Sequence, residues 1–232
     1  MAPARHRQDL AVLGLLQLAD SAFPSGAYTL SHGLETLIAE RIVRDGDDLL
    51  GYVRSCLRHR MARTDLPAVL AAARAADLAT LVAIDGRLDA TKLAAEERAG
   101  STRVGRRLLV EGGRLVESPL AADYGAAAAE GRSPGHAAPA FGVIGRSLGA
   151  DDRACALAFA SAFTIGLVAA AVRLSVVGHR DAQRVIHASS LDIAAAVGIA
   201  AAMDWRDMAS SAPQHDIALS RHEVADVRLF AS

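Results

Sequence analysis

Lysine and cysteine are scarce in this sequence, and each scarcity excludes a class of protein. Lys92 is the only lysine among 232 residues, and Leu93 follows it. A nucleotide-binding P-loop requires a lysine followed by serine or threonine, so the chain is not a P-loop GTPase or ATPase. The two cysteines, Cys56 and Cys155, form neither a CxxC pair nor a disulfide framework. Such cysteine usage is typical of a reduced, cytoplasmic protein.

Aromatic residues are also few, which argues against a sheet. They make up 4% of the chain, although apolar residues make up 52%, much of it alanine. This composition favours helix over strand, and no strand alternation, repeat or long linker is found. We expect an all-α fold: a single compact domain, 1–232, of about eight to ten helices around a central apolar helix over 154–174. Residues 1–8 are expected to be flexible, and 227–232 to form a tail that docks on the core or on a partner.

The charges are nearly balanced, with a net charge of −1. The chain therefore lacks the positive excess that a dominant phosphate-binding surface needs. One predicted helix carries a cluster of Arg54, Arg58, Arg60 and Arg63. We interpret the cluster as a solvated face, with a patch for an acidic protein partner as the alternative. Nucleic acid is not an expected partner, because no aromatic residues interleave with the cluster.

Capping residues indicate where several helices begin. Asp47 is expected to start a helix that runs through Arg63. Ser118-Pro119 combines a capping hydroxyl with proline at the first helical position, which predicts another start. Asp151 or Asp152 is expected to cap the central helix, and a further helix is expected over 181–203.

Two alternative functions follow from local patterns. Residues 145–149 match the GxSxG pattern of serine hydrolases, with Ser147 as the nucleophile, but that mechanism needs a preceding strand and 140–144 look helical. The uncharged stretch Ala154–Val172 is about as long as a membrane span, which leaves open a membrane-associated helical protein. Its high alanine content favours a buried central helix instead.

Histidine spacing offers little support for a metal site. The eight histidines include no i,i+4 pair and no HExxH motif. His215 and His222 share one face of the predicted last helix, but their separation corresponds to roughly 10 Å of helix rise. They remain the candidate metal ligands, with help from another element or across a dimer axis, and solvated or capping roles are favoured.

Three blocks of residues resemble a known family. The first, 16–35, reads LQLADSAFPSGAYTLSHGLE, and the second combines 97–109 with 136–142. The third is the closing segment 216–232. Together they resemble the urease accessory protein UreF family over nearly the whole chain. Leu30 and His179 depart from the family pattern, which often has histidine and glutamine there.

The resemblance implies an all-α cytoplasmic protein, usually a homodimer, with no catalysis and no cofactor of its own. Similar proteins bind UreD, also called UreH, and recruit the GTPase UreG. The complex delivers nickel to apo-urease, made of UreA, UreB and UreC, so that nickel passes through or near it. No nucleic acid and no membrane is implied as a partner.

The resemblance also assigns residues to partner binding and dimerisation. Arg228 is expected to hydrogen-bond to Tyr28 or to backbone carbonyls and so fix the tail. The alternative is that Tyr28 and Phe230 are simply core residues. The assigned residues are Phe23, Pro24, Gly26, Tyr28, Ser31, Gly33, Glu35, Gln183, Arg221, His222, Glu223, Arg228, Leu229 and Phe230.

Overall fold

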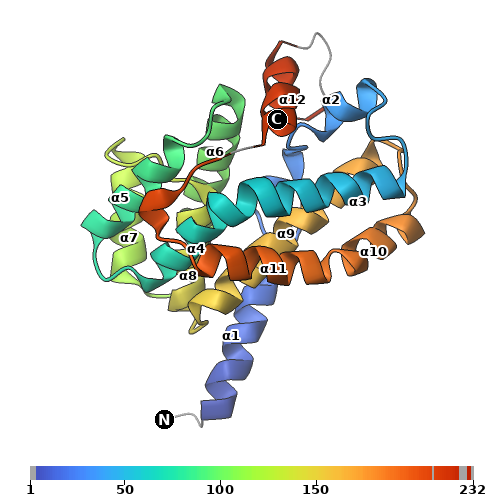
Figure 1. The fold of residues 1–232 in the computed structure, drawn as a ribbon. Coiled ribbons are helices and arrows are strands. Elements are labelled where there is room, and N and C mark those ends of the chain that lie inside the picture. The colour runs from blue at the N-terminus through green and yellow to red at the C-terminus, as the bar shows by residue number, and fades with distance from the viewer. Residues whose placement is uncertain (1–3, 211, 225–228, 231–232) are drawn as a thin grey trace.

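Every regular element among the described residues is a helix, which confirms the predicted all-α class. The computed structural model describes residues 4–210, 212–224 and 229–230, and no strand occurs within them (Figure 1). The α-helices are α1 (Ala4–Ala19), α2 (Leu34–Ala39), α3 (Gly46–Ser55), α4 (Asp65–Arg74), α5 (Leu78–Asp89), α6 (Ala95–Gly112), α7 (Pro119–Ala129), α8 (Ala137–Ser147), α9 (Asp152–Arg173), α10 (His179–Ala188), α11 (Ser190–Ala201) and α12 (Pro213–Glu223). Shorter segments are η1 (Ala27–Thr29), the π-helical η2 (Cys56–Arg60), η3 (Met61–Arg63) and η4 (Trp205–Asp207).

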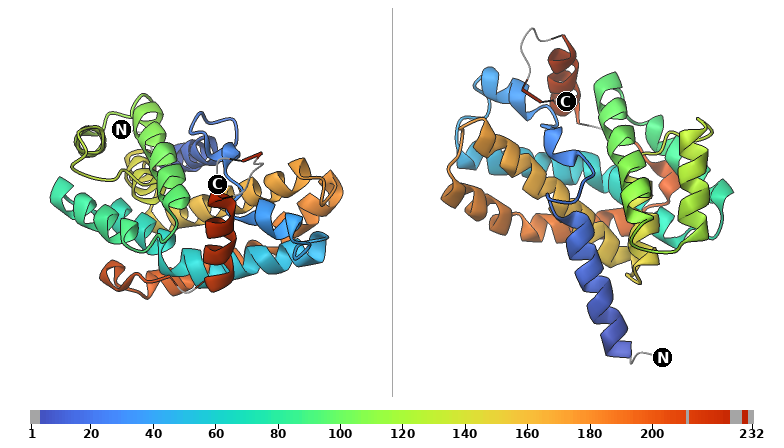
Figure 2. Two further views of the ribbon diagram at one scale, coloured as in Figure 1. Left: turned by 90° about the horizontal axis from the view of Figure 1, so that it is seen from above. Right: turned by 180° about the vertical axis from the view of Figure 1, so that it is seen from behind.

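Helix α9 lies in the middle of the fold, as predicted for 154–174. It packs against α1, α4, α8, α10 and α11, and it also contacts α2 and α3 (Figure 2). Its alanines let these neighbours approach closely, and Ala160, Leu167 and Ala170 are fully buried. Ile165 is 39% exposed, so one face of the helix reaches the surface.

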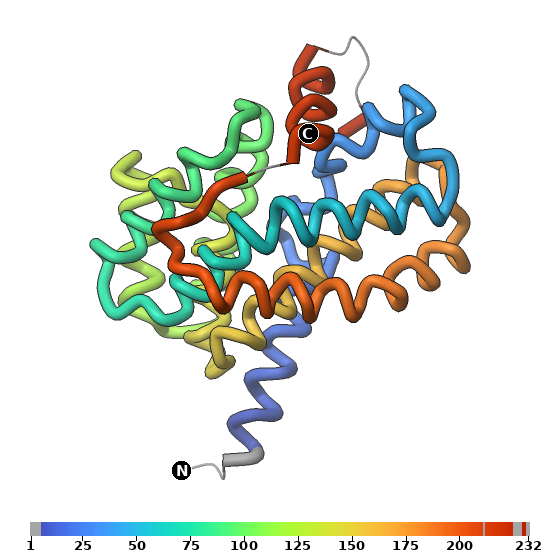
Figure 3. Tube along the Cα trace, viewed as in Figure 1, coloured from blue at the N-terminus to red at the C-terminus, as the bar shows by residue number. Residues whose placement is uncertain are grey.

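Two helical segments pass a length and composition test for membrane spans. They are α9 and the nearly continuous stretch His179–Ala201, which combines α10 and α11 (Figure 3). The core helix of a soluble protein passes the same test, and α9 is packed against helices on several sides. The membrane-associated alternative therefore has no support beyond composition.

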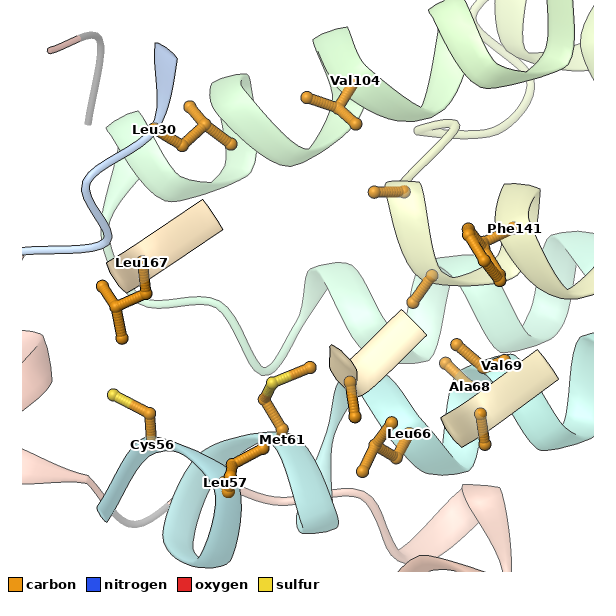
Figure 4. Close-up of a cluster of buried hydrophobic side chains, with 14 of the residues drawn as sticks. Leu30, Cys56, Leu57, Met61, Leu66, Ala68, Val69, Val104, Phe141 and Leu167 are labelled. Atoms are coloured by element: carbon orange, nitrogen blue, oxygen red, sulfur yellow. The ribbon is translucent and has the colours of Figure 1, made fainter. Parts of the chain in front are cut away.

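Helix α8 sits between α4 and α6 at very short distances, and two glycines make this possible. A Cβ atom on Gly142 would lie 2.5 Å from the backbone oxygen of Val69 in α4. A Cβ atom on Gly105 in α6 would lie 2.2 Å from the backbone oxygen of Gly135, just before α8. Only glycine fits at either contact. Buried side chains such as Leu66, labelled with its neighbours in Figure 4, extend the same packing toward α9.

Several predicted helix starts are confirmed. The Ser118 hydroxyl accepts a hydrogen bond from the Ala121 amide at 3.3 Å, and the Asp151 carboxylate accepts one from the Ala154 amide at 2.6 Å. The predicted cap at Asp47 is wrong, because Asp45 caps α3 by accepting from the Asp47 and Asp48 amides. Three aspartates lie within four positions there, and only the backbone conformation selects one.

The helix count and some boundaries differ from expectation. Helix α1 begins at Ala4, within the segment 1–8 that was expected to be flexible, and 1–3 lie outside the described residues. Helix α5 was not expected. The helix expected over 181–203 is divided at Ser189, whose hydroxyl donates to the Val185 carbonyl at 2.8 Å. These differences bring the described helices above the eight to ten expected.

The nucleophile elbow proposed at Ser147 is contradicted by the structure. Ser147 is the last residue of α8, so a helix precedes it where the mechanism needs a strand. Its hydroxyl donates to the Val143 carbonyl at 2.8 Å, an ordinary helical back-bond. GxSxG here marks the end of a helix, and Gly149 adopts the left-handed conformation that follows it, with φ +90°.

We predict that Gly105→Ala lowers the free energy of unfolding by about 3 kcal/mol, because the new methyl group would overlap backbone atoms that cannot rotate away. Gly125→Ala in α7 is the matched control, since its nearest neighbour atom would lie at an ordinary 3.7 Å. We expect that control to be neutral or stabilising by up to about 1 kcal/mol. Urea unfolding followed by circular dichroism measures both, and equal stabilities would refute the close-packing argument.

Candidate functional site

The first block of the family resemblance, residues 16–35, forms the turn between α1 and α2. We call this block the first signature block and its turn the signature turn. Phe23 is inserted into the core at 8% exposure, whereas Pro24 is exposed. Gly26 takes a left-handed conformation, with φ +78°, and the Thr29 hydroxyl closes the turn onto its carbonyl at 2.9 Å. Tyr28 lies at the tip with 60% of its surface exposed. The interpretation of Tyr28 as a core residue is therefore wrong.

Helix α12 rests directly on the end of this block. Gly33 has φ +79°, and a Cβ atom there would lie 3.2 Å from the Ala218 side chain and 3.5 Å from the Leu219 amide nitrogen. Ser31, two residues earlier, is fully buried. The small residues Ser31 and Gly33, just before α2, thus let α12 pack closely against this segment. The first signature block and the last helix are therefore in contact.

The Glu35 carboxylate is the centre of this contact. It lies 3.0 Å from His222 Nε2, and it accepts hydrogen bonds from the Leu229 amide at 2.9 Å and the Phe230 amide at 3.2 Å. Phe230 is 8% exposed, and the Arg173 guanidinium carbon lies 4.4 Å from its ring centroid. Leu229 is 76% exposed. One carboxylate therefore holds the last helix and the segment that follows it.

His222 bridges two acidic side chains. Its other ring nitrogen, Nδ1, lies 2.8 Å from the Glu96 carboxylate, and Glu223 accepts from the Glu96 amide at 2.8 Å. The two ring nitrogens of His222 therefore contact the Glu35 and Glu96 carboxylates in a nearly buried position.

The two candidate metal ligands point to different partners. His215 Nδ1 lies 2.9 Å from the Tyr52 hydroxyl, and that hydroxyl donates to the His32 carbonyl at 2.6 Å. Both nitrogens of His222 face carboxylates. Over the part of the chain that the structure describes, no group of three or more histidine, cysteine or acidic side chains is arranged to hold an ion.

The remaining assigned residues lie outside this contact or at its edge. Arg221 forms an exposed ion pair with Glu40 at 2.7 Å. Gln183 is exposed on α10, which packs against α3, α9 and α11. Arg228, with its expected bond to Tyr28, lies outside the described residues.

Beneath the signature turn lies a buried ionic network that sequence reasoning missed. Lys92 Nζ lies 3.0 Å from the Asp65 carboxylate and 2.9 Å from that of Glu97. Arg60 also pairs with Glu97, and none of the four residues is more than 7% exposed. A lone lysine in an apolar sequence was the available signal, because buried charges require partners.

The prediction that all four arginines of the cluster form a solvated face is wrong at Arg60. Arg54, Arg58 and Arg63 are exposed as expected, but Arg60 is buried. Arg60 follows the buried residues Cys56 and Leu57 by four and three positions, so helical spacing places it on their face rather than beside Arg58. On that face it pairs with Glu97.

The network keeps its acids ionised and nearby histidines neutral. Burial alone would raise the pKa of Asp65, but Lys92 and Arg60 outweigh it and bring that pKa to about 2. Arg60 and Lys92 likewise hold the pKa of Glu97 well below its usual range against the effect of burial. Burial, assisted by the Arg60 charge, lowers the pKa of His32 to about 3 and that of His215 well below its usual value.

A cavity of about 440 Å³ lies above this network, and we call it the signature cavity. The first signature block forms one wall, and α6, α8 and α9 contribute the others. Leu30, Met61 and Val104 face the same space from three directions (Figure 4). Its apolar lining includes Leu18, Leu30, Val104, Leu108, Phe141, Phe159 and Phe163.

We predict that acidification from pH 7 to 5 destabilises the protein through these histidines. Below the unfolded pKa of about 6.5 the unfolded chain binds a proton that partly buried His32 does not take up until about pH 3. Each such histidine then removes about 1.4 kcal/mol from the free energy of unfolding per pH unit.

Urea unfolding at several pH values measures this slope. We expect His32→Gln to make the slope shallower, whereas His187→Gln, at an exposed position on α10, leaves it unchanged. Identical slopes in wild type and His32→Gln would contradict the assignment.

Comparison with known proteins identifies the family. The UreF family model matches residues 43–190. A urease accessory protein UreF of Paenarthrobacter aurescens is 34% identical over 220 residues, covering 95% of this chain and 97% of its own. UreF proteins of Lachnoclostridium phytofermentans, at 34% identity over 95% and 98%, and of Bacillus sp. strain TB-90, at 31% over 95% and 99%, match similarly. The chain belongs to the urease accessory protein UreF family.

Proposed function

We propose that this chain is the UreF component of urease maturation. In that role it binds UreD, also called UreH, recruits the GTPase UreG and helps to deliver nickel to apo-urease. The chain acts as a homodimeric cytoplasmic chaperone component without catalysis of its own, and nucleotide hydrolysis belongs to UreG. Nickel is cargo of the complex rather than a resident cofactor of this chain.

The observation that carries the proposal is the joining of the chain's two ends at Glu35. The first and third blocks, which carry the family resemblance, are about 190 residues apart in sequence, yet both contribute to one surface. Glu35 and His222 make a hydrogen bond to each other, and Glu35 also accepts from the Leu229 and Phe230 amides. Their proposed role is therefore to position that surface. The exposed side chains beside them are available to partners.

The exposed side chains on this surface are suited to protein partners. Ile217, Val224 and Leu229 are apolar and are 51%, 81% and 76% exposed. They follow one another along α12 and the segment after it, and Tyr28 presents an exposed aromatic ring on the first block. Exposed apolar residues concentrated on one element are typical of interaction sites. We assign UreD and UreG binding to this surface.

Complementation tests the proposed function. A urease operon that lacks its own UreF gene receives this chain with its cognate partners, nickel is added, and ammonia release is assayed. Nickel-dependent recovery of activity is the expected result. A soluble helical protein that neither restores activity nor binds its cognate UreD would overturn the proposal.

We predict that Glu35→Gln weakens capture of UreD or UreG about tenfold, which corresponds to about 1.4 kcal/mol. The amide keeps the shape of the side chain but loses the charge that strengthens its three hydrogen bonds. Hydrogen exchange of the 229–230 amides should accelerate in the same variant. Capture on immobilised partner measures the first effect, and mass spectrometry measures the second.

Glu40→Gln is the matched control, because Glu40 lies just beyond α2 and its side chain forms an exposed ion pair with Arg221. It should leave partner capture and exchange near wild-type values. If Glu35→Gln keeps both full capture and slow exchange, then Glu35 does not position the surface.

A further inference from the structure

The signature cavity has the dimensions of a small-molecule site. Its volume of about 440 Å³ falls within the range typical of ligand pockets. Tyr28 and Ile165 line it and are 60% and 39% exposed, so its mouth opens between η1 and α9. The buried network of Arg60, Lys92 and their acidic partners lies at the opposite end. The cavity is therefore reachable from the surface and has a polar floor.

The walls and the floor differ sharply in chemistry. Phe141 and Phe159 meet edge to face with ring centroids 5.3 Å apart, and the Phe163 ring is tilted by 53° against the His32 ring with centroids 4.7 Å apart. Aromatic walls of this kind suit a flat apolar body. The floor offers ammonium and guanidinium donors beside carboxylate acceptors, all at least nine-tenths buried. A ligand that fits must be apolar along most of its length and polar at its inner end.

The charges that line the cavity cancel. The basic side chains are Arg60, Lys92 and Arg173, and the acidic ones are Asp20, Asp65 and Glu97. His32 adds no charge near neutral pH, because burial and the Arg60 guanidinium lower its pKa to about 3. A charged ligand would bring an uncompensated charge into a buried space, which is costly. A neutral polar group can exchange hydrogen bonds with both signs of charge.

We infer that the signature cavity binds a small neutral amphiphile, with an aromatic or aliphatic body between the phenylalanines and an uncharged hydrogen-bonding group toward the ionic floor. This binding is separate from nickel delivery, and it shares Tyr28, at the cavity mouth, with the proposed partner surface. Gly166 of α9 lines the cavity, and a Cβ atom there would meet no other atom within 4 Å. A larger side chain at this position would occupy the cavity without displacing backbone.

A matched pair of fluorescent probes tests the inference. N-phenyl-naphthylamine is neutral and has an N–H group on an aromatic body, and anilinonaphthalene sulfonate is the same body with an added negative charge. We expect saturable binding of one neutral probe per chain and at least tenfold weaker binding of the sulfonate. Equal affinity for the two probes, or no saturable binding of the neutral one, would overturn the inference.

Gly166→Leu should weaken binding of the neutral probe at least tenfold while the thermal midpoint is not lowered. Gly198→Leu in α11 is the matched control, since a Cβ atom on that helical glycine would also meet no other atom within 4 Å, and Gly198 does not line the cavity. It should bind the probe like the wild type. Unchanged probe affinity in folded Gly166→Leu would place binding elsewhere and refute the site. Complementation of urease by the same variants separates this result from the proposed maturation role.

Discussion

The structure depends on the mutual compensation of four nearly buried charges. Arg60 ends η2, Asp65 begins α4, Lys92 lies in the connection before α6, and Glu97 belongs to the first turns of α6. A buried ion pair adds little net stability, but loss of one partner leaves a charge uncompensated at a cost of roughly 3–5 kcal/mol. The four segments are therefore fixed relative to one another. The cavity and the signature turn are built on this base.

The contact between the chain's two ends is built on a second, smaller set of polar side chains. Glu35 and Glu96 approach from α2 and α6, and His222 of α12 lies between them. Phe230 completes the arrangement by packing against Arg173 at the end of the central helix. Elements from the beginning, middle and end of the chain thus converge where partner binding is proposed. A change in any of these elements would therefore alter the same proposed partner surface.

Local physics made part of this structure predictable. Ser118 and Asp151 cap helices through contacts only three residues away, and composition alone excluded a sheet. Arg60 was misplaced because four arginines were assigned to one face, although residues two positions apart, such as Arg58 and Arg60, point to different sides of a helix. The role of Glu35 depends on amides nearly 200 positions away, which no local pattern contains. The resemblance singled out Glu35 and His222 as site residues, but only the structure brought them together.

The burial of Lys92 has a consequence for the chemistry of the outer surface. With the only lysine enclosed, no described surface side chain carries a primary amine. Arginine therefore provides the side chains that recognise acidic groups on that surface, because its planar guanidinium binds carboxylates through paired, directional bonds. Amine-directed cross-linkers and labels accordingly find no lysine to modify on this surface, and any lysine adduct formed in a complex reports on the partner.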